Sequence, residues 1–308
     1  MELKLGLNLP AIQDKRDIKL KSILVPAKLP PLPESFWVDT DVGGVVDERM
    51  FSNDQYGDCV IADQAHFIFR LEKFEQGKQI DITDKEVIDE YFRQSGGRDT
   101  GLYMHSATKE WRTHGLIAGE KPYTIHAFVK ANTADMTELK YCIYLLRGFS
   151  AGVMIFQKDI DQFNAGMPWS LTESNGNYLG GHAIYVNAYD SILPSQEIVM
   201  MKENRVVEYF PSEWGCIVVP DQVESLTYKD RGDYGCCMTW GKTQAFTWDW
   251  WKARAQEAYA IVDEKNKWMG ANSPLDVEAM EKQLQEVTGE TPNNSVCPLC
   301  KIVRKMLA

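Results

Sequence analysis

The feature that most limits the fold of this chain is a polar loop that runs directly into a long apolar segment. Residues 53–59 read NDQYGDC, and residues 60–74 are strongly apolar. This pattern predicts a buried helix that begins near Cys59. Backbone N–H groups at a helix start stabilise negative charge and lower the pKa of a thiol. Cys59 is therefore a candidate nucleophile. The competing interpretation is a small buried hydrophobic residue, which is the commoner role of a cysteine.

The same loop carries candidate donors for an oxyanion. The backbone N–H of Cys59 lies at the helix start, and Asn53 and Gln55 carry side-chain amides a few residues upstream. Donors that point at a developing oxyanion stabilise the tetrahedral intermediate of acyl transfer. We expect the Cys59 N–H and one of these two amides to form such a site.

A second signal is Gly180-Gly181-His182, which opens an alternating apolar run. The alternation predicts a strand, and the glycines permit close backbone approach. A histidine at the start of such a strand can face a cleft and act as a general base, although alone it is more typical of a core histidine. His66 lies about two helical turns after Cys59, too far to serve as its base.

The order of the predicted elements indicates an α+β fold, because helical patterns precede strand patterns. Thr83 and Glu86 form a capping box that opens a second helix. Further helices are predicted at Ser106–Thr113, Met136–Arg147, Thr247–Lys265 and Asp276–Val287. Strands are predicted at Tyr123–Ala131, Ala151–Phe156, Tyr178–Tyr189, 197–201, 205–209, 216–219 and Cys236–Thr239.

Composition excludes several classes of function. The net charge of −11 disfavours nucleic acid and anionic membranes as partners, and no apolar run is long enough to span a bilayer. The seven cysteines, an odd number, favour reduced thiols. Neither a phosphate-binding glycine loop nor the spacing of a catalytic zinc site is present, so we expect no cofactor. Cys297 and Cys300 in the tail could form half of a zinc site, a disulfide or two buried thiols. We expect two buried thiols, because one such pair supplies only two metal ligands.

These features, in this order over most of residues 35–250, resemble the papain-like cysteine peptidases. In that family a Gln lies six residues before the catalytic Cys and a Gly lies two before it, and here Asn53 and Gly57 take these places. The catalytic His of the family corresponds to His182, which follows Cys59 by 123 residues. The start KLGLNLPA, the loop NDQYGDCV, the GGH segment and the TWGKTQ segment are similar to a divergent branch that phages and bacteria encode.

The family completes its triad with an Asn-Ser-Trp-Gly motif. Two segments are similar to it, Met238–Gly241 and Ser212–Gly215, and the strand context favours the first. The family Asn is absent from both. Thr239 and Asn187 are the candidates that could orient the imidazole in its place.

The resemblance implies an α+β, papain-like fold, with an N-terminal helical half that carries the nucleophile helix and a C-terminal antiparallel β half. We expect a Pro-rich extended arm at 1–34 that lies over the domain like a strap. The papain-like domain would occupy 35–267, with an insert at about 190–235, and a helical tail would occupy 268–308.

The resemblance also implies a cysteine hydrolase, a peptidase or amidase, that uses Cys59 and His182 with Asn53 in the oxyanion hole. Its substrate would be a protein or peptide. The alternative is a catalytically weak or inactive structural or interaction protein, such as a phage virion component. The arm and tail would then join copies of the chain or virion subunits. The N-terminal sequence lacks the pattern of a signal peptide. We therefore expect a cytoplasmic location, or a place in a virion if a phage encodes the chain.

Overall fold

The computed structural model describes residues 8–44, 46–190, 234–263 and 273–289. Some sequence predictions lie outside these residues, namely the strands at 197–201, 205–209 and 216–219, the alternative motif Ser212–Gly215, and the tail cysteines Cys297 and Cys300. Within the described residues, none of the helices is long and apolar enough to cross a membrane.

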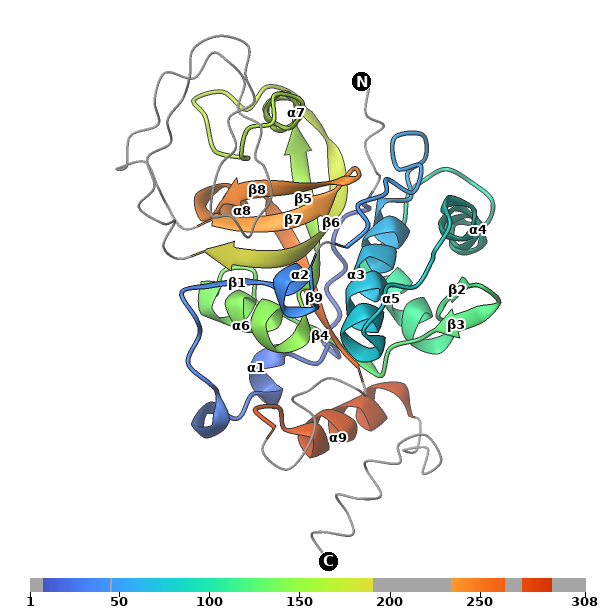
Figure 1. The fold of residues 1–308 in the computed structure, drawn as a ribbon, viewed down its shortest axis with the longest axis vertical. Helices are drawn as coiled ribbons and strands as arrows, with labels where there is room; N and C mark the ends of the chain where they lie inside the picture. The colour runs from blue at the N-terminus through green and yellow to red at the C-terminus, as the bar shows by residue number, and fades with distance from the viewer. Residues whose placement is uncertain (1–7, 45, 191–233, 264–272, 290–308) are drawn as a thin grey trace, which may run out of the picture.

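An antiparallel sheet forms one half of the molecule (Figure 1). Its strands are hydrogen-bonded in the order β4-β9-β5-β6-β7-β8, and β1 pairs with the end of β6. The helices α6, α7 and α8 pack against this sheet. The strands are β1 (Ser35–Trp37), β4 (Ala127–Lys130), β5 (Phe149–Phe156), β6 (Tyr178–Asp190), β7 (Tyr234–Thr239), β8 (Lys242–Thr247) and β9 (Ala255–Val262).

The other half is mainly helical and lies beside the sheet (Figure 1). Its central helix α3 (Cys59–Gln76) begins at the residue that the sequence predicts, and every residue from Cys59 to Leu71 is buried. A helix that is buried all round belongs to the core, and α3 packs on β6, β5 and β7. The rest of this half consists of α4 (Asp84–Ser95), α5 (Met104–Thr113) and the hairpin β2 (Leu116–Ala118) and β3 (Lys121–Tyr123).

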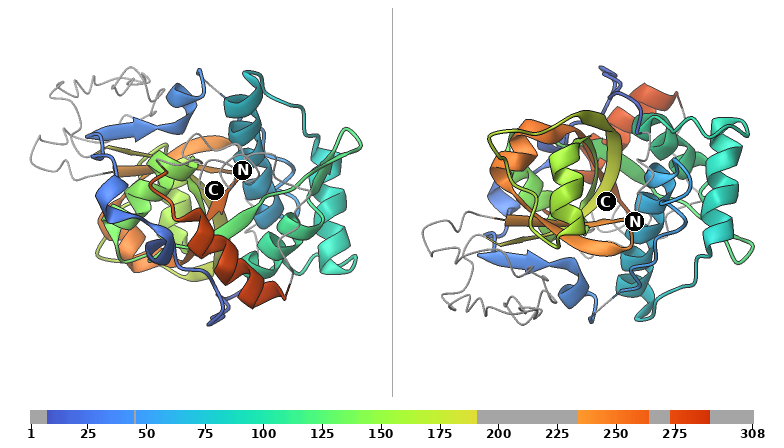
Figure 2. Two further views of the ribbon diagram at one scale, coloured as in Figure 1. Left: turned by 90° about the horizontal axis from the view of Figure 1, so that it is seen from below. Right: turned by 90° about the horizontal axis from the view of Figure 1, so that it is seen from above.

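Local signals in the sequence mark the starts of two helices, α4 and α9 (Val277–Thr288). The predicted capping box is present, because Thr83 accepts from the Glu86 N–H and the Glu86 carboxylate accepts from the Thr83 N–H. Asp276 caps the tail helix α9, which packs against α1. This helix lies at the lower end of the molecule in Figure 1 and faces the viewer in the left view of Figure 2. The remaining helices are α1 (Leu20–Ile23), η1 (Pro26–Lys28), α2 (Val38–Asp41), α6 (Met136–Leu146), α7 (Gln157–Asn164) and α8 (Trp248–Arg254).

The predicted helix at Thr247–Lys265 is wrong in its second half. The helix α8 ends at Arg254, and the chain continues as β9, which lies between β4 and β5. All residues of β9 from Glu257 to Val262 are buried. A strand covered on both faces has a continuous apolar run without period-two alternation, so its sequence is easily read as a helix.

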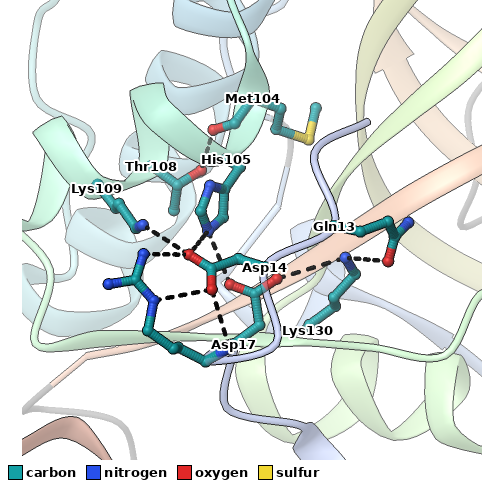
Figure 3. Close-up of polar contacts among 9 residues, drawn as sticks. Gln13, Asp14, Asp17, Met104, His105, Thr108, Lys109 and Lys130 are labelled. Carbon is teal, nitrogen blue, oxygen red and sulfur yellow. Dashed lines mark hydrogen bonds and ion pairs between the residues drawn. The ribbon is translucent and has the colours of Figure 1, made fainter. Parts of the chain in front are cut away.

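The described part of the N-terminal arm lies over its own domain. The Asn8 N–H donates to the Gly181 carbonyl at 3.3 Å, and the Leu9 N–H donates to the Leu102 carbonyl at 2.9 Å. Further along, Asp17 contacts His105 of α5 at 2.8 Å and Lys130 of β4 at 3.4 Å (Figure 3). The arm therefore contacts both halves of the fold.

Candidate active site

Cys59 is the first residue of α3 and is 1% exposed. The backbone N–H of Ala183 donates to its sulfur, which places the thiol against β6, next to the residue that follows His182. Burial raises the pKa of Cys59 to about 12, and the nearby carboxyls of Asp58 and Asp63 raise it further. In this arrangement the thiol is protonated at neutral pH.

His182 lies on β6 with no exposed surface. Its Nε2 and the Thr239 hydroxyl are 2.7 Å apart, which is a hydrogen bond of ordinary length. The Trp240 indole stacks on the imidazole, with 4.0 Å between ring centroids and 15° between planes. The other ring nitrogen, Nδ1, is buried without a hydrogen-bond partner among the described residues. Burial lowers the pKa of His182 to about 3, so the imidazole is neutral.

The structure brings Thr239 to His182 and places Asn187 elsewhere. The amide of Asn187 donates to the Cys236 carbonyl at 3.2 Å and accepts from the Trp37 indole N–H at 3.3 Å. Asn187 therefore does not orient the imidazole in this structure. Thr239 is the last residue of β7 and comes from the motif that the strand context favours.

Of the two candidate oxyanion amides, Asn53 is buried and Gln55 is exposed. The Asn53 Nδ2 donates to the carboxylate of Asp58 at 2.8 Å and lies 3.5 Å from the Tyr56 carbonyl. The amide is thus next to the start of α3, and its N–H groups point at protein acceptors. Its role as an oxyanion donor requires at least one of these bonds to be released.

Two buried carboxyls near the thiol were not predicted from the sequence. Asp58 immediately precedes Cys59, and Asp63 follows it by about one helical turn. Burial raises the pKa of Asp58 to about 7 and that of Asp63 to about 8. Neither Asp63 oxygen has a hydrogen-bond partner of ordinary length among the described residues, and Ser150 is the group that lowers its pKa. The available signal was an aspartate within the apolar run that follows Cys59.

Backbone contacts flank the site on two sides. Gly241, which follows Trp240, packs so closely on residues 48–50 that a Cβ there would lie 3.0 Å from the Glu48 carbonyl oxygen. Gly181, which precedes His182, packs on the arm, and a Cβ there would lie 2.2 Å from the Asn8 carbonyl oxygen. The contact with Asn8 explains why the residue before His182 is a glycine.

Within the described residues, one group has the composition of a metal site, Asp14, Asp17 and His105 (Figure 3). Its oxygens already pair with cations. Asp14 binds Arg16 and Lys109, and Asp17 binds Lys130. We therefore assign this group to holding the arm on the domain. Within the described residues, the cysteines at 59, 142, 236 and 237 are buried and form no disulfide.

The Cys59 thiol thus lies against the strand that carries His182, and the His182 imidazole contacts the Thr239 hydroxyl. The sequence matches neither a protein-family model nor a curated protein. Solved structures do share its fold, at low sequence identity. Xylellain, a cysteine protease from Xylella fastidiosa, matches with a TM-score of 0.57 and 14% identity over 85% of this chain and 98% of xylellain.

Two further solved structures are similar. Digestive procathepsin L2 from the larval midgut of Tenebrio molitor has a TM-score of 0.52 and 15% identity, over 85% of this chain and 78% of that one. The cysteine protease and lectin-like domains of Cwp84 from Clostridium difficile have a TM-score of 0.50 and 10% identity, over 80% of this chain and 56% of that one. Identities this low establish the fold alone. The chain therefore has the α+β, papain-like fold that its sequence predicts.

Proposed function

We propose that the chain is a cysteine hydrolase, a peptidase or related amidase, with Cys59 as nucleophile and His182 as general base. The observation that carries the proposal is the 2.7 Å hydrogen bond between His182 Nε2 and the Thr239 hydroxyl, next to a cysteine that begins a helix. A nucleophile, a base and a group that orients the base are the recurring parts of covalent acyl transfer. The fold is shared with solved cysteine proteases, which favours peptides as substrates.

The proposed reaction has two halves. Nδ1 of His182 takes the thiol proton as the Cys59 sulfur attacks the substrate carbonyl, and the ring then gives this proton to the leaving amine. A thioester remains on Cys59, and water, activated by the same imidazole, releases the acid and restores the thiol. The Cys59 N–H and the Asn53 amide stabilise the oxyanion in both halves. Thr239 keeps Nε2 engaged, so that Nδ1 remains the nitrogen that exchanges the proton.

A second candidate function is that of a structural or interaction protein on a hydrolase fold, with a virion as one setting. The observation that favours it is the burial of the dyad, because Cys59 is 1% exposed and His182 is fully buried. A neutral, dry thiol is a poor nucleophile. The described arm, however, contacts its own chain through Asn8 and Asp17, so residues 8–17 do not need a neighbouring copy for a binding partner.

Hydrolysis of quenched fluorescent peptides of varied sequence separates the two candidates. The variants Cys59→Ala and His182→Ala should each lower turnover by about a thousandfold or more, the scale of losing a nucleophile or its base. Cys142→Ala is the matched control, because Cys142 is equally buried but lies on α6. Turnover that survives Cys59→Ala, or a folded wild-type protein that cleaves none of the peptides, would favour the second candidate.

A further inference from the structure

Asp58 occupies an unusual position for a carboxyl. It is the residue before the α3 helix, yet its side chain does not cap the helix. The side chain is fully buried, its Oδ1 accepts from the Asn53 amide at 2.8 Å, and its Oδ2 has no hydrogen-bond partner among the described residues. A buried oxygen without a partner makes the charged form costly, so this carboxyl is poised to change protonation state.

The groups that face Asp58 reinforce this conclusion. The acidic groups are Asp84 of α4 and Asp99 of the loop after α4, and both raise the pKa of Asp58. The neutral groups are the Asn53 amide, the Tyr91 hydroxyl of α4 and the Cys59 thiol. The acidic neighbours and burial together raise the pKa of Asp58 to about 7, and the bond from Asn53 opposes this rise.

We propose that Asp58 is a positioning residue for the candidate reaction: its carboxylate holds the Asn53 amide away from the oxyanion and places negative charge beside Cys59, and its protonation relieves both effects. This proposal rests on the proposed function. A hydrogen bond to a charged carboxylate is roughly twice as strong as one to a neutral carboxyl, so a proton on Asp58 loosens the Asn53 amide. It also removes a charge that opposes formation of the Cys59 thiolate.

The direction of the pH effect follows. Above neutral pH Asp58 is ionised, the Asn53 amide is held and the thiolate is disfavoured. Below neutral pH Asp58 is protonated, and both constraints weaken. The site therefore works best on the acidic side of neutrality, until protonation of other groups limits it.

One experiment follows the coupling itself, without substrate. Selective labelling of Asp and Asn makes the Asp58 carboxyl carbon and the Asn53 side-chain amide visible by NMR. We expect both signals to shift together between pH 5 and 9 with a midpoint near 7, the value set by burial of Asp58. The Asn53 shift should disappear in Asp58→Asn, which keeps an oxygen acceptor but cannot titrate. It should persist in His182→Ala, because the dyad plays no part in it.

A second measurement connects the coupling to the reaction. We compare the rate of Cys59 alkylation in Asp58→Asn with the rate in wild type, as a ratio of variant to wild type. We expect this ratio to be close to one at pH 5.5 and to rise about tenfold or more by pH 8.5, because only the wild type gains the negative charge of Asp58 near the thiol. Asp84→Asn is the matched control. It removes a nearby charge that does not bond to Asn53, and its ratio should change much less with pH.

The outcomes separate this inference from the proposed function. If Cys59 reacts in a His182-dependent way but the Asp58→Asn ratio stays flat, or if the Asn53 signal ignores pH, the positioning role is wrong and the proposed function stands. If Cys59 shows no His182-dependent reactivity, the proposed function fails. The positioning role then fails with it, even where the Asn53 signal titrates.

Discussion

Asp63 should make the stability of this protein depend strongly on pH. Its side chain is buried in the first part of α3, and burial raises its pKa from 3.8 to about 8. The folded state therefore binds a proton that the unfolded state releases between about pH 4 and pH 8, so stability falls as pH rises through this window. The shift spans about four pKa units at roughly 1.4 kcal/mol each, or ~6 kcal/mol in total above pH 8.

The substitution Asp63→Asn removes this dependence while nearly preserving shape. We expect the free energy of unfolding of the variant, relative to wild type, to increase by ~1.4 kcal/mol per pH unit between about pH 4 and 8. Urea unfolding at several pH values measures both proteins. A difference in the free energy of unfolding that is constant with pH shows how well the new amide packs. Only the slope of that difference with pH measures the proton bound by Asp63. The titration of Asp58 is common to both proteins and cancels in the difference.

Asp249→Asn supplies the control, because the Asp249 side chain is 80% exposed and should give curves parallel to wild type. Parallel curves for Asp63→Asn as well would refute the reasoning. Asp63 would then be ionised in the folded state, with a cation or water satisfying it.

Three further predictions concern other contacts. Thr239→Val removes the hydroxyl that is hydrogen-bonded to His182 Nε2. It should slow Cys59 alkylation at pH 7 about tenfold with little change in circular dichroism, and an unchanged rate would contradict the orienting role of Thr239. The Arg70 guanidinium donates to the buried Asp39 carboxylate of α2 at 2.7 and 2.9 Å. Arg70→Ala leaves this carboxylate unpaired and should lower the free energy of unfolding in urea by ~3–5 kcal/mol, whereas a loss below ~1 kcal/mol would contradict this role of the ion pair. Gly181→Ala places a methyl group against the arm at Asn8, and should speed hydrogen exchange at the Leu9 amide; unchanged protection would show that the arm does not depend on this contact.

Local signals in the sequence predicted the elements that position Cys59. The start of α3 at Cys59 follows from a polar loop next to an apolar run, and the capping box at Thr83 and Glu86 is a contact between near neighbours in the chain. Such features need no knowledge of the tertiary fold. In contrast, β9 is central in the sheet and buried on both faces, so its pairing partners alone distinguish it from a helix.

In the candidate site, too, some features could be predicted from the sequence and others depend on tertiary packing. The order of motifs singled out Cys59 and His182 and left Thr239 and Asn187 as two candidates to orient the imidazole. The structure places the Thr239 hydroxyl 2.7 Å from His182 Nε2. The stacking of Trp240 on His182 and the raised pKa of Asp58 could not be predicted from the sequence. Each depends on what packs against the residue from distant segments, here β7, α4 and the loop after it.

The central claim, that Cys59 and His182 act as a nucleophile and its base, is tested most directly by alkylation of the folded protein at pH 7 with iodoacetamide. Mass spectrometry gives the rate at each cysteine, and buried Cys142 serves as the internal reference. The account predicts that Cys59 reacts at least about tenfold faster than Cys142 and that His182→Ala abolishes this difference. Equal rates at the two cysteines in wild type, or a fast rate at Cys59 that survives His182→Ala, would contradict the account.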